Sequence, residues 1–342
     1  MVCRLLAVPG RGCGLEFDGR FGETNGIAKD RRPEKMKFYT GTGSWRWQRC
    51  SVFRCCLFAL LLIFASGQHL SAGEPHIPER IVSLAPHITE IVFKLGAGDR
   101  LVGRTEFCRY PAAALDIESV GGYLNVDYEK IVSLQPDAVL QFPNAETRKK
   151  LELLGFKVVD IPNETIEEIL SGIHKTGASL GLADRAEAVC RGIRDTLSLI
   201  RAQKDSLPGI RTFLLVGREP GKLRGLYAAG KKTYLSEILQ ICGGQNVFAD
   251  VGVRYFGVNT EDVLSRDIRL ILEFQANPGL SAREQQAEIS VWQALPGIPA
   301  VRNQAVYLLT NPGFLTPGPR ITRIAKELAA IIKQVRMRQG ER

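Results

Sequence analysis

The sequence lacks the short motifs on which common hydrolytic and metal-dependent reactions depend. Its 342 residues contain no Gly-x-Ser-x-Gly nucleophile elbow, no P-loop and no His-Glu-x-x-His pair. It has only four histidines, and it has no Cys-x-x-Cys pair and no mixed cluster of cysteine and histidine. These absences argue against a zinc site. For catalysis the sequence is therefore poor in recognisable motifs, and we expect no cofactor and no directly bound metal ion.

Cysteine is scarce in the part of the chain that is expected to fold. Five of the eight cysteines lie in the first 73 residues, which leaves Cys108, Cys190 and Cys242. Three cysteines allow one disulfide with a leftover thiol, or no disulfide at all, and sequence spacing does not choose between these outcomes.

A large excess of charge of one sign is also missing from the body of the chain. The formal net charge is +9, but residues 1–73 hold 11 Lys and Arg against 5 Asp and Glu. The remaining 269 residues hold 34 against 31. A nearly neutral surface with both signs interspersed gives no signal for nucleic-acid binding, so no nucleic-acid partner is expected.

No hydrophobic run in the sequence is long enough for an ordinary transmembrane helix. The apolar run from Cys55 to Ala65 has eleven residues, whereas a spanning helix needs about 20. It follows a polar segment with three arginines and precedes small and polar residues, which is the layout of a secretory signal peptide. We therefore expect an N-terminal extension and signal peptide over residues 1–73, cleaved after Gly67 or near Gly73. An uncleaved membrane anchor is the alternative.

The first 35 residues are rich in glycine and arginine and show no hydrophobic periodicity. Met36 is a plausible start, because the signal-peptide layout begins after it. Residues 1–35 are therefore interpreted as an upstream extension with no part in the fold.

The stretch from Arg80 to Gly103 has the pattern of one βαβ unit. Residues 81–84 form a short apolar run with the composition of a buried strand. Residues 89–95 carry the apolar spacing of a helix, and residues 101–103 begin the next strand. The turn over residues 85–87 therefore lies at the carboxyl end of the first strand, where open α/β sheets bind ligands.

His87 has two interpretations at this position. It can be a residue at the start of the helix that is hydrogen-bonded to the backbone. It can also contact a bound cofactor or chelate, even as an axial ligand to the metal of that chelate.

Strand and helix patterns alternate over two parts of the chain, which predicts an α/β fold with mostly parallel sheets. The first lobe is expected over residues 74–162 and the second over residues 209–342. Residues 163–208 between them are almost entirely compatible with helix, with Gly177 and Gly181 marking a break. A helical connector resists hinge bending, so we expect two Rossmann-like lobes joined rigidly.

A short pattern recurs once in each lobe. Residues 126–131 and 258–263 each contain a helix-capping residue followed two positions later by glutamate, and each precedes a strand. The two glutamates, Glu129 and Glu261, therefore occupy corresponding places in two similar lobes. Glutamate in the first turn of a helix is favoured by the helix dipole alone. The alternative is that both dock into basic pockets on a two-subunit partner.

Aromatic and arginine side chains are expected where the two lobes face one another. Four aromatic residues occur in loops after predicted strands: Phe107, Tyr123, Tyr255 and Phe256. If they converge they would suit a large flat ligand, although ordinary loop packing explains each of them singly. Anionic groups of a ligand could be neutralised by Arg218, Arg254 and Arg320, each of which could equally be a solvated surface residue.

Four segments together resemble a known family: SLAPHITEIVFKLGAGDRLVG, TEFCRYP, VGGYLNVDYEKIVSLQPDAVL and ICGGQNVFADVGVRYFGVNTEDVL. They are similar to the periplasmic substrate-binding proteins of ABC importers for cobalamin and ferric siderophores, and most similar to the cobalamin-binding members. The resemblance covers roughly residues 80–335. It implies a class III fold, in which two α/β lobes are joined by one long rigid α-helix and close little, and it implies no enzymatic activity.

The resemblance also implies roles for individual residues. On the ligand cleft of the family fall Ala85, Pro86, His87, Phe107, Tyr123 and Tyr255, and the loop positions add Arg218, Phe256 and Arg320. Both tyrosines stand where the cobalamin binders have tryptophan, which leaves the identity of the ligand open. Glu129 and Glu261 fall on the two glutamates that bridge to arginines of the permease dimer.

The resemblance implies a periplasmic, monomeric protein that captures a corrinoid such as cobalamin and delivers it to an ABC permease dimer with its ATPase subunits. A ferric-siderophore or haem binder of the same family is the alternative. An exported α/β enzyme would need a titratable pair in the cleft, for which His87 with Glu106 is the only pair that the sequence offers. A structural envelope protein would bind no ligand.

Overall fold

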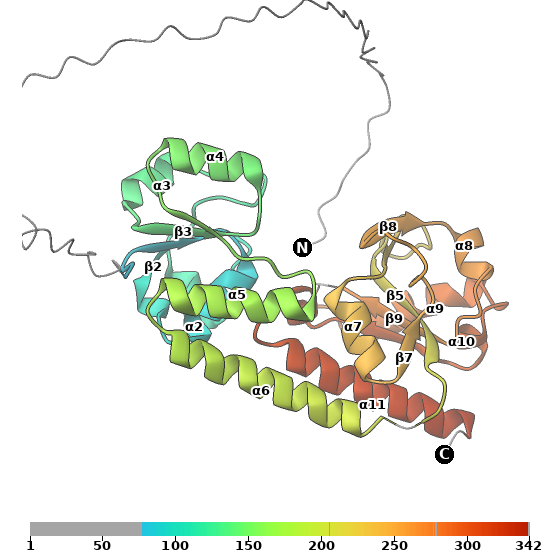
Figure 1. Ribbon diagram of the computed structural model, residues 1–342. Helices are drawn as coiled ribbons and strands as arrows, with labels where there is room; N and C mark the ends of the chain where they lie inside the picture. The colour runs from blue at the N-terminus through green and yellow to red at the C-terminus, as the bar shows by residue number, and fades with distance from the viewer. Residues whose placement is uncertain (1–76, 205, 276, 278, 341–342) are drawn as a thin grey trace, which may run out of the picture. The chain divides into compact units, whose positions relative to one another are not determined.

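A computed structural model describes residues 77–204, 206–275, 277 and 279–340 of the chain. All of them belong to one compact unit built on two β-sheets with helices around them (Figure 1). The predicted extension and signal peptide over residues 1–73 lie outside the described residues. In the part of the chain that the structure describes, every helix is too short or too polar to span a lipid bilayer.

The first sheet is entirely parallel and has the strand order β2-β1-β3-β4. Its central strand is the predicted apolar run, of which Ile81 and Val82 are fully buried. The bounds are β1 Ile81–Ser83, β2 Leu101–Arg104, β3 Ala138–Gln141 and β4 Val158–Asp160. The helices between them are α2 Pro86–Lys94, α3 Tyr128–Leu134 and α4 Ala145–Leu153, with 3-10 turns η1 Gly98–Arg100 and η2 Ala112–Asp116.

Helix α2 begins three residues earlier than the sequence pattern predicts. Ala85 is the N-cap and Pro86 is the first helical residue. Proline is well suited to that place, because its fixed φ fits the helix and its missing N–H would have no intrahelical partner there. Pro86 and His87 are therefore the first turn of α2, and only Ala85 remains in the predicted turn.

The second sheet has the order β10-β9-β5-β6-β8, with β7 beside β5. Strands β7, β5, β9 and β10 are parallel and repeat the order of β2, β1, β3 and β4, so the predicted internal repeat is confirmed in the strand order. The bounds are β5 Ile210–Gly217, β6 Leu226–Ala229, β7 Gly244–Asn246, β8 Tyr255–Val258, β9 Leu270–Phe274 and β10 Val306–Leu309. Helices and turns of this half are α7 Tyr234–Ile241, α8 Thr260–Leu264, α9 Ala282–Ser290, η3 Val291–Ala294, α10 Pro299–Arg302 and η4 Pro312–Leu315.

The second sheet also carries two antiparallel strands that the repeat does not predict. Strand β6 pairs with β5 on one side and β8 on the other, both antiparallel. Tyr255 and Phe256 therefore lie on a strand, and their predicted place in a loop is wrong. Their aromatic side chains favour a strand, but the pairing partner β6 lies far away in the sequence.

The connector consists of two helices, α5 Ile166–Ser179 and α6 Ala183–Ala202. The break falls at residues 180–182, where Gly181 has a positive φ of 70°. Gly177 lies inside α5 and does not mark the break as predicted. A Cβ atom on Gly177 would lie 2.4 Å from the Cβ of Ala186, so this glycine lets α5 and α6 approach closely.

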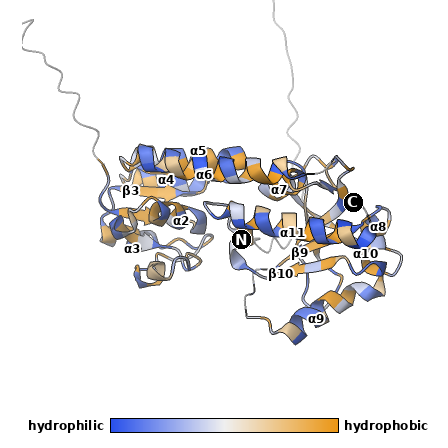
Figure 2. Ribbon diagram, turned by 90° about the horizontal axis from the view of Figure 1, so that it is seen from below, coloured by the Kyte–Doolittle hydropathy of each residue, from blue (hydrophilic) through white to orange (hydrophobic). Residues whose placement is uncertain are grey.

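One continuous hydrophobic core joins the two sheets. It contains buried residues from β1 and α2 of the first half, from α5 and α6, and from β5, β9 and the terminal helix α11 Ile321–Gln339. Figure 2 shows strands β3 and β10 in hydrophobic colours beside helices that alternate polar and apolar residues. A smaller cluster, which includes Val82, Ile131 and Leu151, covers the other face of the first sheet. The shared core explains why the two halves behave as one compact unit.

The three described cysteines, Cys108, Cys190 and Cys242, are buried and free. Burial raises the pKa of the Cys190 thiol to about 11 and that of Cys242 to about 12. Both thiols are therefore neutral and act as small apolar core residues at neutral pH.

Candidate functional site

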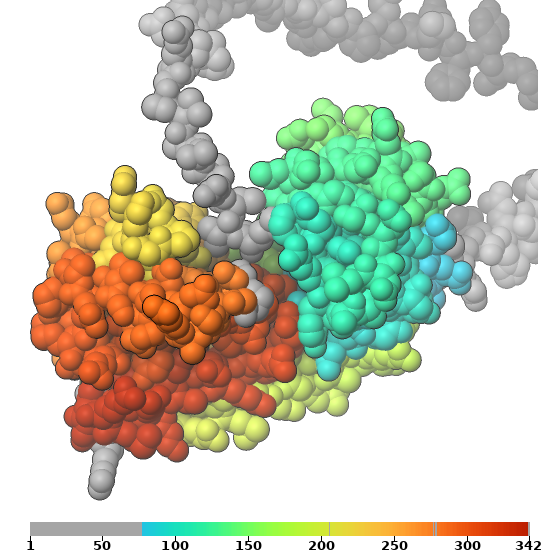
Figure 3. Space-filling model, turned by 180° about the vertical axis from the view of Figure 1, so that it is seen from behind, coloured from blue at the N-terminus to red at the C-terminus, as the bar shows by residue number. Residues whose placement is uncertain are grey.

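The loops after the strands of the first sheet meet the second half of the chain at a set of specific contacts. The backbone N–H of Tyr234, the first residue of α7, donates to the carbonyl of Glu164 at 2.7 Å. In return the N–H of Ile166, the first residue of α5, donates to the carboxylate of Glu237 at 2.7 Å. These bonds fix the start of the connector against the second half. Figure 3 shows that the surface is hollowed between the two halves.

His87 is buried, and its side chain is hydrogen-bonded to the backbone. Its side chain is packed against the edge of the Phe142 ring, and its Nε2 lies 3.1 Å from the carbonyl oxygen of Ile161. A carbonyl oxygen only accepts, so Nε2 carries the hydrogen. Burial lowers the pKa of His87 from 6.5 to about 4, so the ring is neutral at pH 7. The backbone-bonded interpretation is the one that the structure shows, and the predicted axial contact is wrong for this arrangement.

His87 should make the stability of the protein depend on pH. Its pKa is lower in the folded chain than in the unfolded chain, so the unfolded chain binds more protons between pH 6.5 and 4. The free energy of unfolding should therefore fall on acidification, by about 3 kcal/mol from this group between pH 7 and pH 4. Urea unfolding of the wild type and of His87→Gln across this range would measure the difference in slope. Parallel pH profiles would contradict the assignment.

Arg320 joins the two halves through a buried carboxylate. Its Nε donates to Oε2 of Glu90 at 2.7 Å, and its Nη2 bonds Oε1 of the same group. The guanidinium also lies 3.9 Å from the centre of the Tyr110 ring. Burial raises the pKa of Glu90, and the contact with Arg320 opposes that rise. Arg320 is therefore engaged in an internal ion pair, which corrects its prediction as a group that neutralises ligand charge.

Arg218 is likewise not available to a ligand. Its side chain is 1% exposed and lies 2.9 Å from Oε1 of Glu273 and 2.7 Å from Oε2 of Glu288. Glu273 also accepts from the indole N–H of Trp292 at 3.0 Å. The predicted ligand contact is wrong, because two carboxylates inside the second half already hold the guanidinium.

Tyr255 and Phe256 face opposite sides of strand β8, as consecutive strand residues must. Tyr255 stacks on Tyr227 of β6, with ring centres 6.5 Å apart and an interplanar angle of 15°. Phe256 packs edge-on against Phe248 inside the second half, with ring centres 5.7 Å apart. Both rings are half-buried. Tyr255 is the stronger candidate for ligand contact, because Glu164 and Arg254 lie near its hydroxyl. Tyr227 was missed by the sequence analysis, although the short apolar run of β6, Leu226–Ala229, between two glycines is a signal for a strand.

Tyr255 lies close to the start of the connector. Burial and the nearby carboxylate of Glu164 raise the pKa of the Tyr255 hydroxyl, and Arg254 opposes that rise. The pKa of Glu164 is raised mainly by its own burial, and Arg254 reaches across to Glu168 at 3.4 Å. A tyrosine ring, a partly buried carboxylate and an exposed arginine thus come together where the second half meets the connector.

On the first half, Phe107 and Tyr123 are half-buried in the loops that follow β2. A Cβ atom on Gly122 would lie 3.3 Å from the Phe107 ring and 2.6 Å from Oε1 of Glu106, so this glycine keeps the two loops close together. Pro86 is also half-buried at the start of α2, whereas Ala85 is buried. Phe107, Tyr123 and Pro86 thus keep accessible surface at the carboxyl edge of the sheet.

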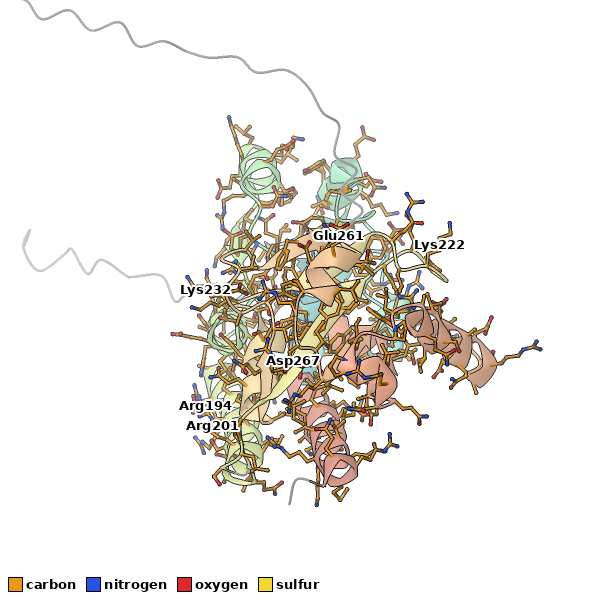
Figure 4. All side chains as sticks on the ribbon, turned by 90° about the vertical axis from the view of Figure 1, so that its right-hand side faces the viewer. Arg194, Arg201, Lys222, Lys232, Glu261 and Asp267 are labelled. Carbon is orange, nitrogen blue, oxygen red and sulfur yellow. The ribbon has the colours of Figure 1, made fainter. Side chains whose placement is uncertain are left out.

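Glu129 and Glu261 occupy the predicted equivalent positions. Each is the second residue of a short helix, after the caps Asp127 and Asn259, which accept from backbone N–H groups at 2.9 and 2.7 Å. Both glutamates are exposed, and neither has an ion pair or side-chain hydrogen bond with the described residues. Figure 4 shows Glu261 at the upper end of the second half.

The structure gives little support to two other kinds of site. Within the described ranges, no hydrogen bond or ion pair joins His87 to Glu106, and no group of three His, Cys, Asp or Glu is placed to hold a metal ion.

An open cavity of about 1020 Å³ lies between α5, α6 and α7 and is lined by Arg194 and Arg201 among others (Figure 4). None of the predicted site residues lines it.

The family model and the similar curated proteins agree on the family to which this chain is similar. The family model described as periplasmic binding protein matches residues 81–312. A vitamin B12-binding protein of Vibrio parahaemolyticus is 29% identical over 290 residues, which are 84% of this chain and 99% of that protein. The vitamin B12-binding protein of Vibrio cholerae is 30% identical over 282 residues, covering 81% and 96% of the two chains.

Two solved structures show the same fold. The periplasmic vitamin B12 binding protein BtuF of Vibrio cholerae superposes with a TM-score of 0.65 at 30% identity, covering 76% of this chain and 98% of that one. A periplasmic heme binding protein from Pseudomonas aeruginosa superposes with a TM-score of 0.64 at 25% identity, covering 75% and 93%. The predicted fold of two α/β lobes with mostly parallel sheets is therefore confirmed, with a two-helix connector in place of one long helix.

Proposed function

Because this chain belongs to the periplasmic binding protein family, we propose that it is the solute-binding component of an ABC importer and carries a corrinoid such as cobalamin. The observation that carries the proposal is the match to proteins named vitamin B12-binding protein, which extends over 96–99% of their length. Such a role needs a scaffold with an accessible site between two rigid halves. Solute capture without chemical change also agrees with a site that has no joined acid–base pair among the described residues.

The ligand would lie between the half-buried surfaces of Phe107 and Tyr123 on one side and Tyr255 on the other. Tyr255 would suit stacking on a flat macrocycle, because Tyr227 stacks on one face of its ring and fixes the ring's orientation. Arg254 and Glu164 would supply polar contacts at the same place. We also propose that the protein acts in the periplasm as a monomer. Its lobes would be residues 74–162 and 209–342, with residues 163–208 as the connector.

Delivery would follow through Glu129 and Glu261, one on each lobe, which would pair with basic groups on a dimeric permease. Exposed carboxylates that have no partner among the described residues remain available for such a contact. The ATPase that drives transport would belong to the partner, since the sequence contains no P-loop.

The proposal is tested by calorimetric titration of the purified protein with cyanocobalamin, haemin and a ferric hydroxamate. We expect one-to-one binding of cyanocobalamin with a dissociation constant below about 1 µM. Tight binding of haemin alone would move the assignment to the haem carriers, which the similarity to the Pseudomonas aeruginosa structure makes the second candidate. Binding of none of the three would overturn the proposed ligand class.

Tyr255→Ala should weaken ligand binding by about 1–3 kcal/mol, because it removes the stacking ring. Phe256→Ala is the matched control, since the neighbouring ring packs inside the second half and its loss should lower stability while sparing affinity. Calorimetry with the best ligand measures the first effect and thermal unfolding the second. Equal affinity of Tyr255→Ala and the wild type would remove Tyr255 from the site.

A further inference from the structure

The two helices that carry Glu129 and Glu261 share a second feature, which is an exposed aliphatic residue at the same helical position. Val132 is the fifth residue after the cap Asp127, and Leu264 is the fifth residue after the cap Asn259. They are 45% and 48% exposed. Residues three positions apart on a helix are surface neighbours, so each aliphatic side chain lies beside the unpaired glutamate of its own helix.

Packing among the described residues does not account for Val132 and Leu264. The core contact of each helix is made by the preceding residue, Ile131 in α3 and Val263 in α8, and both of these are fully buried. A single exposed aliphatic residue is ordinary on a protein surface. Here the same pair of an unpaired carboxylate and an exposed aliphatic group occurs at matching positions of two repeats whose strand order also matches.

The remaining charges on the two helices are satisfied internally. Lys130 pairs with Glu118 at 2.9 Å, and Asp262 accepts from the backbone of Asn259. Within the part of the chain that the structure describes, each helix therefore presents one carboxylate without a partner and one exposed aliphatic group. Figure 1 shows α3 and α8 on the same side of the two sheets, away from α6 and α11, so one partner surface can reach both.

We infer that Val132 and Leu264 form the apolar half of the docking surface, and that the partner presents a cation beside an apolar recess twice, once on each of two symmetry-related subunits. This inference rests on the proposed function, because that function supplies the two-subunit permease as the occupant. The glutamates steer and orient the complex, since rim charges act mainly on association and register. The aliphatic groups, buried on docking, add affinity and slow dissociation.

The test measures docking of the full protein to the permease–ATPase complex of the same organism in lipid nanodiscs, by biolayer interferometry. Val132→Ala with Leu264→Ala should raise the dissociation constant about tenfold or more, and each single variant should contribute a similar part. The matched control is Leu199→Ala with Met337→Ala, which truncates two exposed apolar residues on α6 and α11. The control should dock as the wild type does.

The outcomes separate this inference from the proposed function. Unchanged docking of the Val132→Ala, Leu264→Ala variant, together with weakened docking of Glu129→Ala with Glu261→Ala, overturns the inference and leaves the function standing. The wild-type protein could fail to bind cyanocobalamin while the Val132→Ala, Leu264→Ala variant loses docking and the Leu199→Ala, Met337→Ala control does not. That result supports the docking surface and overturns the proposed ligand class. Failure of the wild-type protein to dock overturns both the surface and the permease as its partner.

Discussion

Replacing Arg218 with methionine is expected to lower the free energy of unfolding by about 3–5 kcal/mol. The guanidinium is 1% exposed and lies between Glu273 and Glu288, whose side chains are 2% and 15% exposed. Methionine fills much of the same volume but leaves two carboxylates without a counter-charge, and a buried unpaired charge is among the most destabilising changes known for a point substitution. The expected loss is a large fraction of the stability of an ordinary domain.

Urea unfolding followed by circular dichroism measures this effect. Arg269→Met is the matched control, because Arg269 pairs with Asp267 at 3.4 Å on the surface, with both side chains about half exposed. Its removal should cost no more than about 1 kcal/mol. Adding Glu273→Gln and Glu288→Gln to Arg218→Met should recover part of the loss, since neutral amides no longer need a counter-charge. A loss below about 1 kcal/mol for Arg218→Met would show that the carboxylates find other compensation.

Local signals account for the elements whose bounds the sequence predicts best. The cap Asp127 and the break at Gln135, which has a positive φ of 47°, define the bounds of α3. Helix α7, Tyr234–Ile241, likewise begins directly after its cap Thr233. Caps and helix ends involve neighbours in the chain, so one sequence contains the whole signal.

Features that depend on distant partners were not predictable in the same way. Tyr255 and Phe256 belong to a strand only because β6 lies alongside. Arg218 is charged and directly follows the strand β5, which ends at Gly217. Nothing near it in sequence indicates that Glu288, 70 positions away, holds it. His87 had both of its interpretations open until the fold placed the Ile161 carbonyl against its ring. In each case the partner is brought in by tertiary structure, which the local pattern does not encode.

The positions of Glu129 and Glu261 were predictable because the repeat encodes them twice. Each glutamate follows its cap by two residues in a helix between corresponding strands. Capping and the helix dipole explain why a carboxylate is tolerated there. They do not explain the absence of an internal partner at both sites among the described residues, which is the observation that favours docking.

Glu129→Ala combined with Glu261→Ala should abolish uptake of the ligand and leave its affinity for the purified protein unchanged. Truncating one member of a desolvated interfacial charge pair costs about 2–5 kcal/mol, so losing both should weaken docking by roughly a thousandfold or more. Among the described residues, no hydrogen bond or ion pair joins either side chain to the residues proposed to hold the ligand, so ligand affinity should not change. Uptake of labelled cyanocobalamin by cells that carry only the variant, with calorimetry on the same protein, measures both quantities.

The matched control removes two exposed acids from the opposite side of the molecule, Asp195 on α6 and Glu327 on α11. It changes the net charge by the same amount, so a general electrostatic effect would appear in both variants and a docking effect in only one. Restoring the charge with Glu129→Asp and Glu261→Asp should recover part of the uptake, because the carboxylate returns on a shorter side chain. Loss of ligand affinity in the double alanine variant would place the glutamates in the binding site, and normal uptake would remove them from the docking surface.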